Sequence, residues 1–298
     1  MIPATRTVWV ETDLEPDDVL ALYMLPRIDY CVVGEGDVSI KFDRINAYLR
    51  LLNQSSCKTI MGDSSIELTP FIKDVKEFET LDHCDSVTDY FQSFEEFARS
   101  ETPVFFSLKP MRELLRHYKD QPEKVKALCS NVILYAYGGF NFRCVLKNDK
   151  VSLLKLLGCF KETHIYESFY VSGESNTVNK NTFPKLYDHI TSNPKYATLL
   201  KLVKNWNQHI MSQCLNDNRP RSKKIVESIK EHEHFQFVLA DFGLIAVHDQ
   251  VVGQPIMNLR FVNNYTTFDI TKDGSSCYVY HQMDNQLIEN LILSKLNA

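Results

Sequence analysis

The order of strand-like and helix-like segments in the first 55 residues constrains the fold most strongly. Residues 7–11 and 30–33 are short apolar runs typical of buried strands, and each is followed by a polar turn and a segment with helical periodicity. The first helix is expected over residues 17–25, after Pro16, which suits a first helical position because its missing N–H needs no partner there. Strand, turn and helix repeated in this order indicate a parallel sheet covered by helices.

The pattern recurs less regularly along the rest of the chain. Short apolar runs predict strands at 58–61, 102–107, 131–136 and 235–240, and helices are expected over 111–118, 183–190, parts of 194–236, from 242 and over 286–296. The tail, residues 258–280, alternates apolar and polar side chains and is expected to form antiparallel strands. No repeat or linker divides the sequence. We therefore predict one α/β domain over residues 1–298, with a mainly parallel central sheet flanked by helices and a small antiparallel C-terminal addition.

Composition and charge exclude several function classes. The 33 Lys and Arg residues against 38 Asp and Glu residues give a net charge of -5, without the basic footprint that nucleic-acid binding requires. No apolar run reaches the roughly 18 residues that a membrane span needs. The eight cysteines are scattered without a CxxC pair, which favours reduced core thiols of a cytoplasmic protein over a zinc site or a disulfide framework. A soluble protein that acts on a small molecule is expected.

Five carboxylates lie within eight residues directly after the first expected strand, at Glu11, Asp13, Glu15, Asp17 and Asp18. Open α/β sheets bind their ligands beyond the carboxyl ends of the strands. Acids this close repel one another unless a cation screens them, and Ca²⁺ and Mg²⁺ take oxygen ligands of this kind. The pattern therefore favours a metal site. The alternative is a solvated acidic loop in which Asp17 and Asp18 complement the positive end of the following helix.

These residues also resemble a known family. The run Glu11-x-Asp13-x-x-x-Asp17-Asp18-x-x-Ala21-Leu22 is similar to the N-terminal signature D-x-D-P-G-x-D-D-x-x-A-L of the inosine-uridine nucleoside hydrolases. Weaker matches follow in the family's order between about residues 7 and 250: Gly36-Asp37-Val38 for G-N-V, Leu108-Lys109-Pro110 for T/L-G-P, Gly138-Gly139 for G-G, Glu174-Ser175-Asn176 for E-x-N, and Asp241 for the aspartate of H-D-P-L-A-V. The resemblance implies a nucleoside-hydrolase-like fold and an enzyme that hydrolyses an N-glycosidic bond, releasing free base and ribose.

The resemblance also implies roles for individual residues. Calcium (Ca²⁺) would be held by Asp13, Asp18, Asp241 and the main-chain carbonyl of Leu108. Asp13 would in addition accept a proton from the attacking water, which the metal makes more acidic. The ribosylated substrate would be bound by Asp17, Glu174 and Asn176 at its ribose hydroxyls, with Asp37 near the ribose and the leaving group.

Departures from the family pattern leave the substrate undetermined. Ala240 replaces the histidine that protonates the departing base in many members, and Asp37 replaces an asparagine. Ser168 stands where an asparagine usually reaches the 5′-hydroxyl. Four histidines are candidates to replace the missing acid, with the first and last of them the first to substitute: His209, His232, His234 and His248. The identity of the base, tolerance of a 5′-phosphate and the oligomeric state, with a homo-oligomer among the alternatives, do not follow from the sequence.

Two other functions remain open at this point. A non-catalytic member of the same fold would bind a ribosylated ligand, which the missing histidine favours and the retained carboxylates oppose. A metal-dependent phosphohydrolase of the haloacid-dehalogenase type also uses acids after its first strand. Its nucleophilic aspartate would stand two residues before a second aspartate, where this chain has Glu11.

Overall fold

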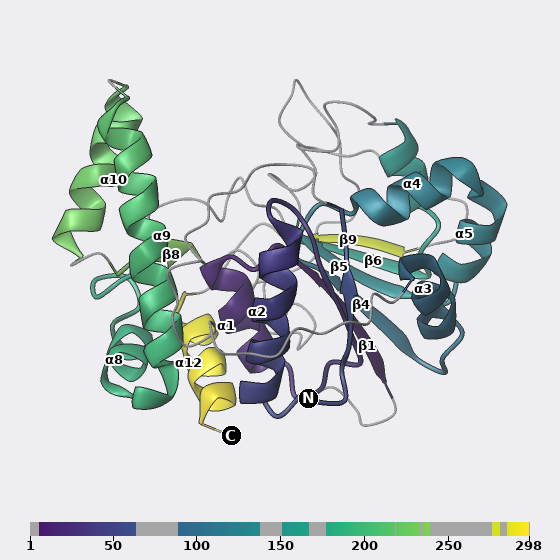
Figure 1. Ribbon diagram of the computed structural model, residues 1–298, viewed down its shortest axis with the longest axis horizontal. Coiled ribbons are helices and arrows are strands. Elements are labelled where there is room, and N and C mark those ends of the chain that lie inside the picture. The colour runs from purple at the N-terminus through teal and green to yellow at the C-terminus, as the bar shows by residue number, and fades with distance from the viewer. Residues whose placement is uncertain are drawn as a thin grey trace.

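A parallel sheet forms the centre of the structure (Figure 1). The computed structural model describes residues 6–63, 89–137, 151–166, 177–217, 219–232, 235–238, 276–280 and 285–297. Within them, seven strands follow the order β3-β2-β1-β4-β5-β6-β9, and each strand is parallel to its neighbours. The strands are β1 (Thr7–Thr12), β2 (Tyr30–Val33), β3 (Lys58–Met61), β4 (Pro103–Ser107), β5 (Ile133–Tyr137), β6 (Glu162–Tyr166) and β9 (Ser276–Tyr280). The order reverses between β1 and β4, and ligands bind beyond the carboxyl ends of parallel strands at such a point.

Helices cover both faces of this sheet because successive strand residues point to opposite sides. Val8 and Val10 pack in one core cluster, whereas Trp9 between them packs in a second. The first cluster includes residues of α1 (Pro16–Met24), α2 (Val38–Leu51), α8 (Pro184–Ser192), α9 (Ala197–Leu215) and α12 (Asn285–Leu296). The second includes residues of α3 (Tyr90–Ala98), α4 (Arg112–Asp120), α5 (Pro122–Cys129) and a helix over 151–157.

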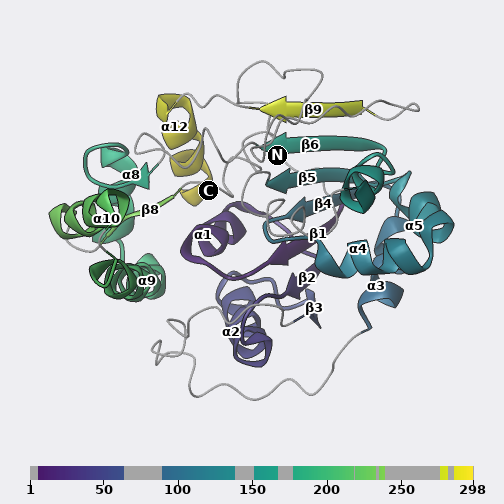
Figure 2. The same cartoon turned by 90° about the horizontal axis from the view of Figure 1, so that it is seen from above.

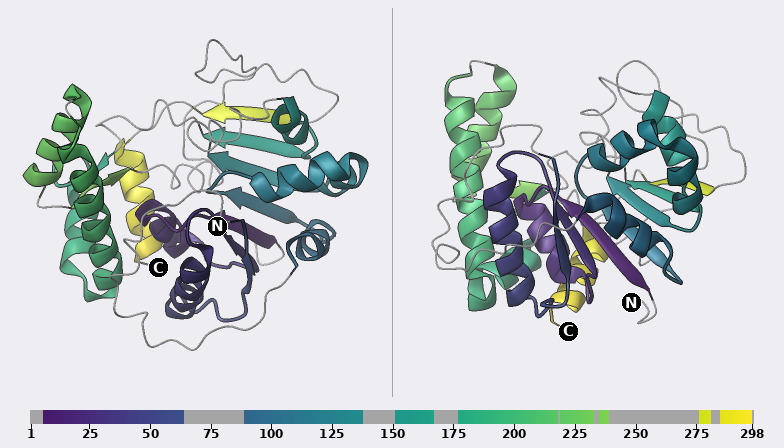
Figure 3. Two further views of the ribbon diagram at one scale, coloured as in Figure 1. Left: turned by 45° about the horizontal axis from the view of Figure 1, so that its top comes forward. Right: turned by 45° about the vertical axis from the view of Figure 1, so that its right-hand side comes forward.

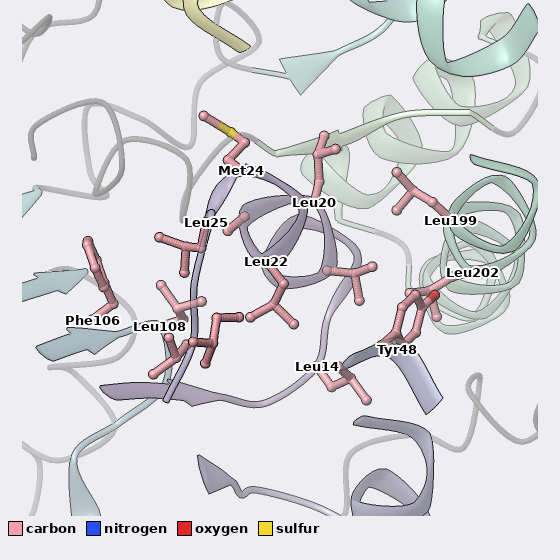
Figure 4. Close-up of a cluster of buried hydrophobic side chains, with 14 of the residues drawn as sticks. Leu14, Leu20, Leu22, Met24, Leu25, Tyr48, Phe106, Leu108, Leu199 and Leu202 are labelled. Carbon is pink, nitrogen blue, oxygen red and sulfur yellow. The ribbon is translucent and has the colours of Figure 1, made fainter. Parts of the chain in front are cut away.

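Helix α1 is buried except at Asp17 and Tyr23, which are half-buried. All four residues 19–22 are fully buried, as expected for a helix that is apolar all round after its first turn. In Figure 4, Leu199 and Leu202 of α9 lie on one side of α1, and Leu108 lies on the side of the sheet. Figure 3 shows from two further directions that α1 lies between the sheet and α9.

A group of helices stands opposite the carboxyl ends of the strands. In Figure 2 the arrowheads of β5, β6 and β9 point toward α8, α9, α12 and α10 (Pro220–Glu231). A short 3₁₀ helix, Pro194–Tyr196, and an antiparallel pair, β7 (Thr177–Val178) with β8 (Phe237–Val238), belong to the same group. The ring centroids of Tyr23 in α1 and Tyr196 in the 3₁₀ helix are 5.4 Å apart, so these two rings connect the group of helices to α1. The carboxyl ends of β5, β6 and β9 therefore point toward this group of helices.

The structure confirms most of the predicted elements, within one or two residues at their ends. Strand β8 is shorter than the predicted strand at 235–240 and pairs with β7 outside the main sheet. The antiparallel prediction for the tail is wrong at β9, which extends the main sheet parallel to β6. Alternating side chains identify a strand but carry no information about the direction of its partner. Residues 258–275 and the helix predicted from 242 lie outside the described residues. No helix in the described ranges is long and apolar enough to cross a membrane.

Candidate functional site

The acidic turn occupies the junction between β1 and α1. The Thr12 hydroxyl donates a hydrogen bond of 2.5 Å to the Asp18 carboxylate and accepts one of 2.9 Å from the Leu14 N–H. The Glu15 N–H donates to the other Asp18 oxygen at 3.3 Å, so Asp18 closes the first turn of α1. Leu14 has a φ of 59°, which is uncommon for a branched side chain. The turn is therefore held in shape by Asp18 and by the buried side chain of Leu14.

Burial and mutual repulsion disfavour negative charge in this turn. Burial, followed by the charges of Asp13 and Asp17, raises the pKa of Asp18 well above its ordinary value. Burial likewise raises the pKa of Asp13, whose carboxyl group lies within hydrogen-bonding reach of that of Asp18. Burial and the neighbouring aspartates raise the pKa of Glu15 as well. A cation bound between Asp13 and Asp18 would remove the electrostatic cost of ionising them.

Lys41 is a buried cation beside this turn that lies outside the acidic sequence motif. It lies in the first turn of α2, is only 4% exposed, and donates a hydrogen bond from Nζ to the main-chain carbonyl of Asp13. Its charge lowers the pKa of Asp13 and of Glu15, against the larger effect of burial. One signal in the sequence points to it: α2 starts after the second strand, so its first turn lies at the same edge of the sheet.

Leu108 and Asp37 also lie at the carboxyl edge. Leu108 follows β4, and its N–H donates a hydrogen bond of 2.8 Å to the carbonyl of Glu11 in β1. Asp37 is the N-cap residue of α2 and is exposed; its carboxylate accepts hydrogen bonds from the Ser39 hydroxyl at 2.9 Å and the Ile40 N–H at 3.4 Å. This capping role accounts for an acid at position 37 even when no ligand is bound. The predicted contact between Asp37 and the substrate stays a prediction.

Glu11, the first acid of the sequence motif, takes part in a separate buried network. Its carboxylate accepts hydrogen bonds from the Tyr90 hydroxyl at 2.6 Å and the Trp9 indole at 3.3 Å, and lies 3.3 Å from Lys109 Nζ. Lys109 is 1% exposed and also pairs with Glu113 at 2.5 Å. Burial raises the pKa of Glu11, whereas the Lys109 ammonium lowers the pKa of Glu113 despite burial. Lys109 is the shared cation of this network.

Two glycines make room for the Lys109–Glu113 pair. A Cβ atom on Gly34, after β2, would lie 2.8 Å from Cε of Lys109. A Cβ atom on Gly62, after β3, would collide with the Glu113 carboxylate, which accepts a hydrogen bond of 2.8 Å from the Asp63 N–H. The pair therefore fixes the loops after β2, β3 and β4 against one another, next to the acidic turn.

The remaining predicted site residues are Glu174, Asn176 and Asp241, which lie outside the described residues together with Ala240, Ser168 and His248. Among the described residues, no three His, Cys, Asp or Glu side chains are grouped to hold a metal ion. His209 lies on α9, where burial lowers its pKa. Of the predicted ligand set, Asp13, Asp18 and Leu108 thus share one edge of the sheet, and the role of every predicted site residue stays a prediction.

The raised pKa of Asp18 predicts a specific pH dependence of stability. Above about pH 4 the unfolded chain has released this proton while the folded state retains it, so ionisation of Asp18 destabilises the metal-free fold as pH rises toward the folded pKa. In thermal melts with chelator between about pH 4 and pH 8, the Tm of Asp18→Asn minus that of the wild type is expected to increase with pH. A difference that stays constant or decreases would contradict the assignment.

Comparison with solved structures identifies proteins that share this fold. No protein-family model and no curated protein matches the sequence. The inosine-uridine preferring nucleoside hydrolase of Bacillus anthracis superposes with a TM-score of 0.65 at 11% identity, over 98% of this chain and 99% of that chain. An inosine-guanosine nucleoside hydrolase gives 0.60 at 12% identity, over 99% of both chains. The type III effector protein XopQ, complexed with adenosine diphosphate ribose, gives 0.66 at 14% identity, over 98% of this chain and 91% of that chain. At these identities the likeness concerns the fold, and this chain has a nucleoside-hydrolase-like fold.

Proposed function

We propose that this chain hydrolyses the N-glycosidic bond of a ribosylated small molecule and uses Ca²⁺ as its cofactor. The observation that carries the proposal is the pair of adjacent carboxyl groups of Asp13, which is half-buried, and Asp18, which is buried, at the strand-order reversal between β1 and β4. Two neighbours with the same fold are nucleoside hydrolases, which supports this reaction class.

The donor set at this point fits a hard divalent cation. Asp13 and Asp18 bring two carboxyl groups together where burial and repulsion oppose their charge, and oxygen ligands of this kind suit Ca²⁺. With them, the Leu108 carbonyl and Asp241 would hold the ion. Bound there, the cation would lower the pKa of a coordinated water and orient the ribose hydroxyls. Mg²⁺ suits the site less because it demands a tight octahedral shell.

The protein groups would then act on water and on the sugar. Asp13, whose pKa is raised by burial, would accept a proton from the attacking water. Asp17, partly exposed in the first turn of α1, would hydrogen-bond a ribose hydroxyl together with Glu174 and Asn176. The surrounding carboxylates would stabilise the positive charge that develops on the sugar. Asp37 would lie near the leaving group.

Leaving-group preference tests the reaction. Because Ala240 takes the place of the family's acid, the chain is expected to favour leaving groups that depart without protonation, such as nicotinamide from its riboside. A missing general acid costs roughly 10²–10⁴-fold, so kcat/KM for nicotinamide riboside or a nitrophenyl riboside is expected to exceed that for inosine by a similar factor. The measurement is release of free base, with and without chelator.

Two outcomes of this screen would change the assignment. Comparable values for inosine and the activated ribosides would show that another group, such as His209 or His248, supplies the proton. Activity that survives chelation would contradict the role of Ca²⁺.

The second candidate is a binding protein for a ribosylated ligand. Its support is the effector with the same fold that is complexed with adenosine diphosphate ribose. Binding of that compound without turnover of any ribosylated compound in the screen would favour this candidate. A haloacid-dehalogenase-type phosphohydrolase has no support, because the place of its nucleophile is taken by Glu11, which is fully buried and faces Lys109.

A further inference from the structure

Lys41 contacts the acid cluster, a name used here for the carboxylate residues of the β1–α1 turn: Asp13, Glu15, Asp17 and Asp18. The ammonium group belongs to a side chain that is 4% exposed, and it is bonded to the main-chain carbonyl of Asp13, 28 residues earlier in the chain. The helix that carries it is fixed independently, because Phe42, Ile45 and Tyr48 of α2 are buried in the core. Lys41 is therefore held at the cluster by the packing of α2.

The electrostatic position of Lys41 differs from that of the other buried lysine. Lys109 is paired with the carboxylates of Glu11 and Glu113, at 3.3 and 2.5 Å. Lys41 instead contacts the cluster itself, because its ammonium group donates a hydrogen bond to the main-chain carbonyl of Asp13. A divalent ion on the carboxylates of Asp13 and Asp18 would thus bind beside a fixed positive charge, and like charges a few ångströms apart repel strongly in a partly buried site.

We propose that Lys41 is a specificity-determining residue that weakens the affinity of the acid cluster for divalent cations. The wild-type chain then binds Ca²⁺ only in the range of weak sites, with a Kd of roughly 10⁻⁴–10⁻³ M. The same ammonium keeps the cluster partly neutralised when no metal is bound. This inference rests on the proposed function only in taking Asp13 and Asp18 as metal ligands.

The test compares three single variants of the full chain. Lys41→Met removes the charge, Lys41→Arg keeps it, and Lys58→Met is the matched control because Lys58 pairs with Glu96 at the surface. Calcium affinity is measured by calorimetry on chelator-stripped protein, with terbium luminescence as a second readout. We expect Lys41→Met to bind Ca²⁺ at least ~10-fold more tightly than the wild type. We expect Lys41→Arg and Lys58→Met to stay within about threefold of it.

Equal affinity in the wild type and Lys41→Met, or no binding in either, would overturn the proposal. If Lys41→Met fails to fold, Lys41→Gln replaces it, and the wild type alone remains informative because a submicromolar Kd for Ca²⁺ would also overturn the proposal. Tighter binding by Lys41→Met without hydrolysis by any variant would support this inference and refute the hydrolase. Calcium-dependent hydrolysis with unchanged calcium affinity in Lys41→Met would refute this inference and support the hydrolase.

Discussion

Replacement of Asp13 by asparagine is expected to lower kcat/KM for ribosyl hydrolysis by at least about 10³-fold. Loss of a general base alone costs roughly 10²–10⁴-fold, and the same substitution removes a charged ligand from the metal. Asparagine has nearly the shape of aspartate, so the β1–α1 turn is retained. The measurement is release of free base at saturating Ca²⁺, with the best substrate of the screen.

The stability of Asp13→Asn separates this effect from unfolding. Burial raises the pKa of Asp13, so removing its charge is expected to leave the Tm of the metal-free protein unchanged or higher near neutral pH. Functional sites commonly reduce stability in this way. The control is Glu96→Gln, an acid at the surface that pairs with Lys58 and is expected to keep wild-type activity. Near wild-type turnover in Asp13→Asn would refute the proposed role.

Replacement of Lys109 by methionine is expected to lower the free energy of unfolding by about 3–5 kcal/mol, because removing one partner leaves buried charges uncompensated. Glu11 and Glu113 would face each other in a site that water does not reach, with Glu11 fully buried and Glu113 nearly so. Methionine is close to lysine in length, so the change in packing is small. Urea unfolding followed by circular dichroism measures the loss.

Lys58→Met is the matched control for Lys109→Met. Lys58 forms an exposed ion pair with Glu96 at 2.8 Å, and exposed pairs contribute only about 0–1 kcal/mol. A triple variant, Lys109→Met with Glu11→Gln and Glu113→Gln, is expected to recover part of the loss because no buried charge is then left unpaired. A loss below about 1 kcal/mol in Lys109→Met would show that the network is not structurally important.

The sequence alone determined the elements that depend on local pattern. The apolar run of β1, the acidic turn and Pro16 predicted the β1–α1 unit, and the unit recurs in β2 and α2. Apolar periodicity, turn chemistry and helix-start residues act over a few neighbours, so they can be read without knowing the fold. The order of weaker family-like motifs then predicted the fold that the comparison with solved structures confirmed.

Only the tertiary structure decided which charges meet. Glu11 and Asp13 belong to one motif, yet Glu11 joins Lys109 while Asp13 lies next to Asp18 and Lys41. The direction of β9 and its place beside β6 were likewise decided there. These contacts join segments that are far apart in the chain, as Tyr90 and Glu11 are at 79 residues. Local pattern carries no information about such partners, because they are selected by the packing of whole helices and strands against one another.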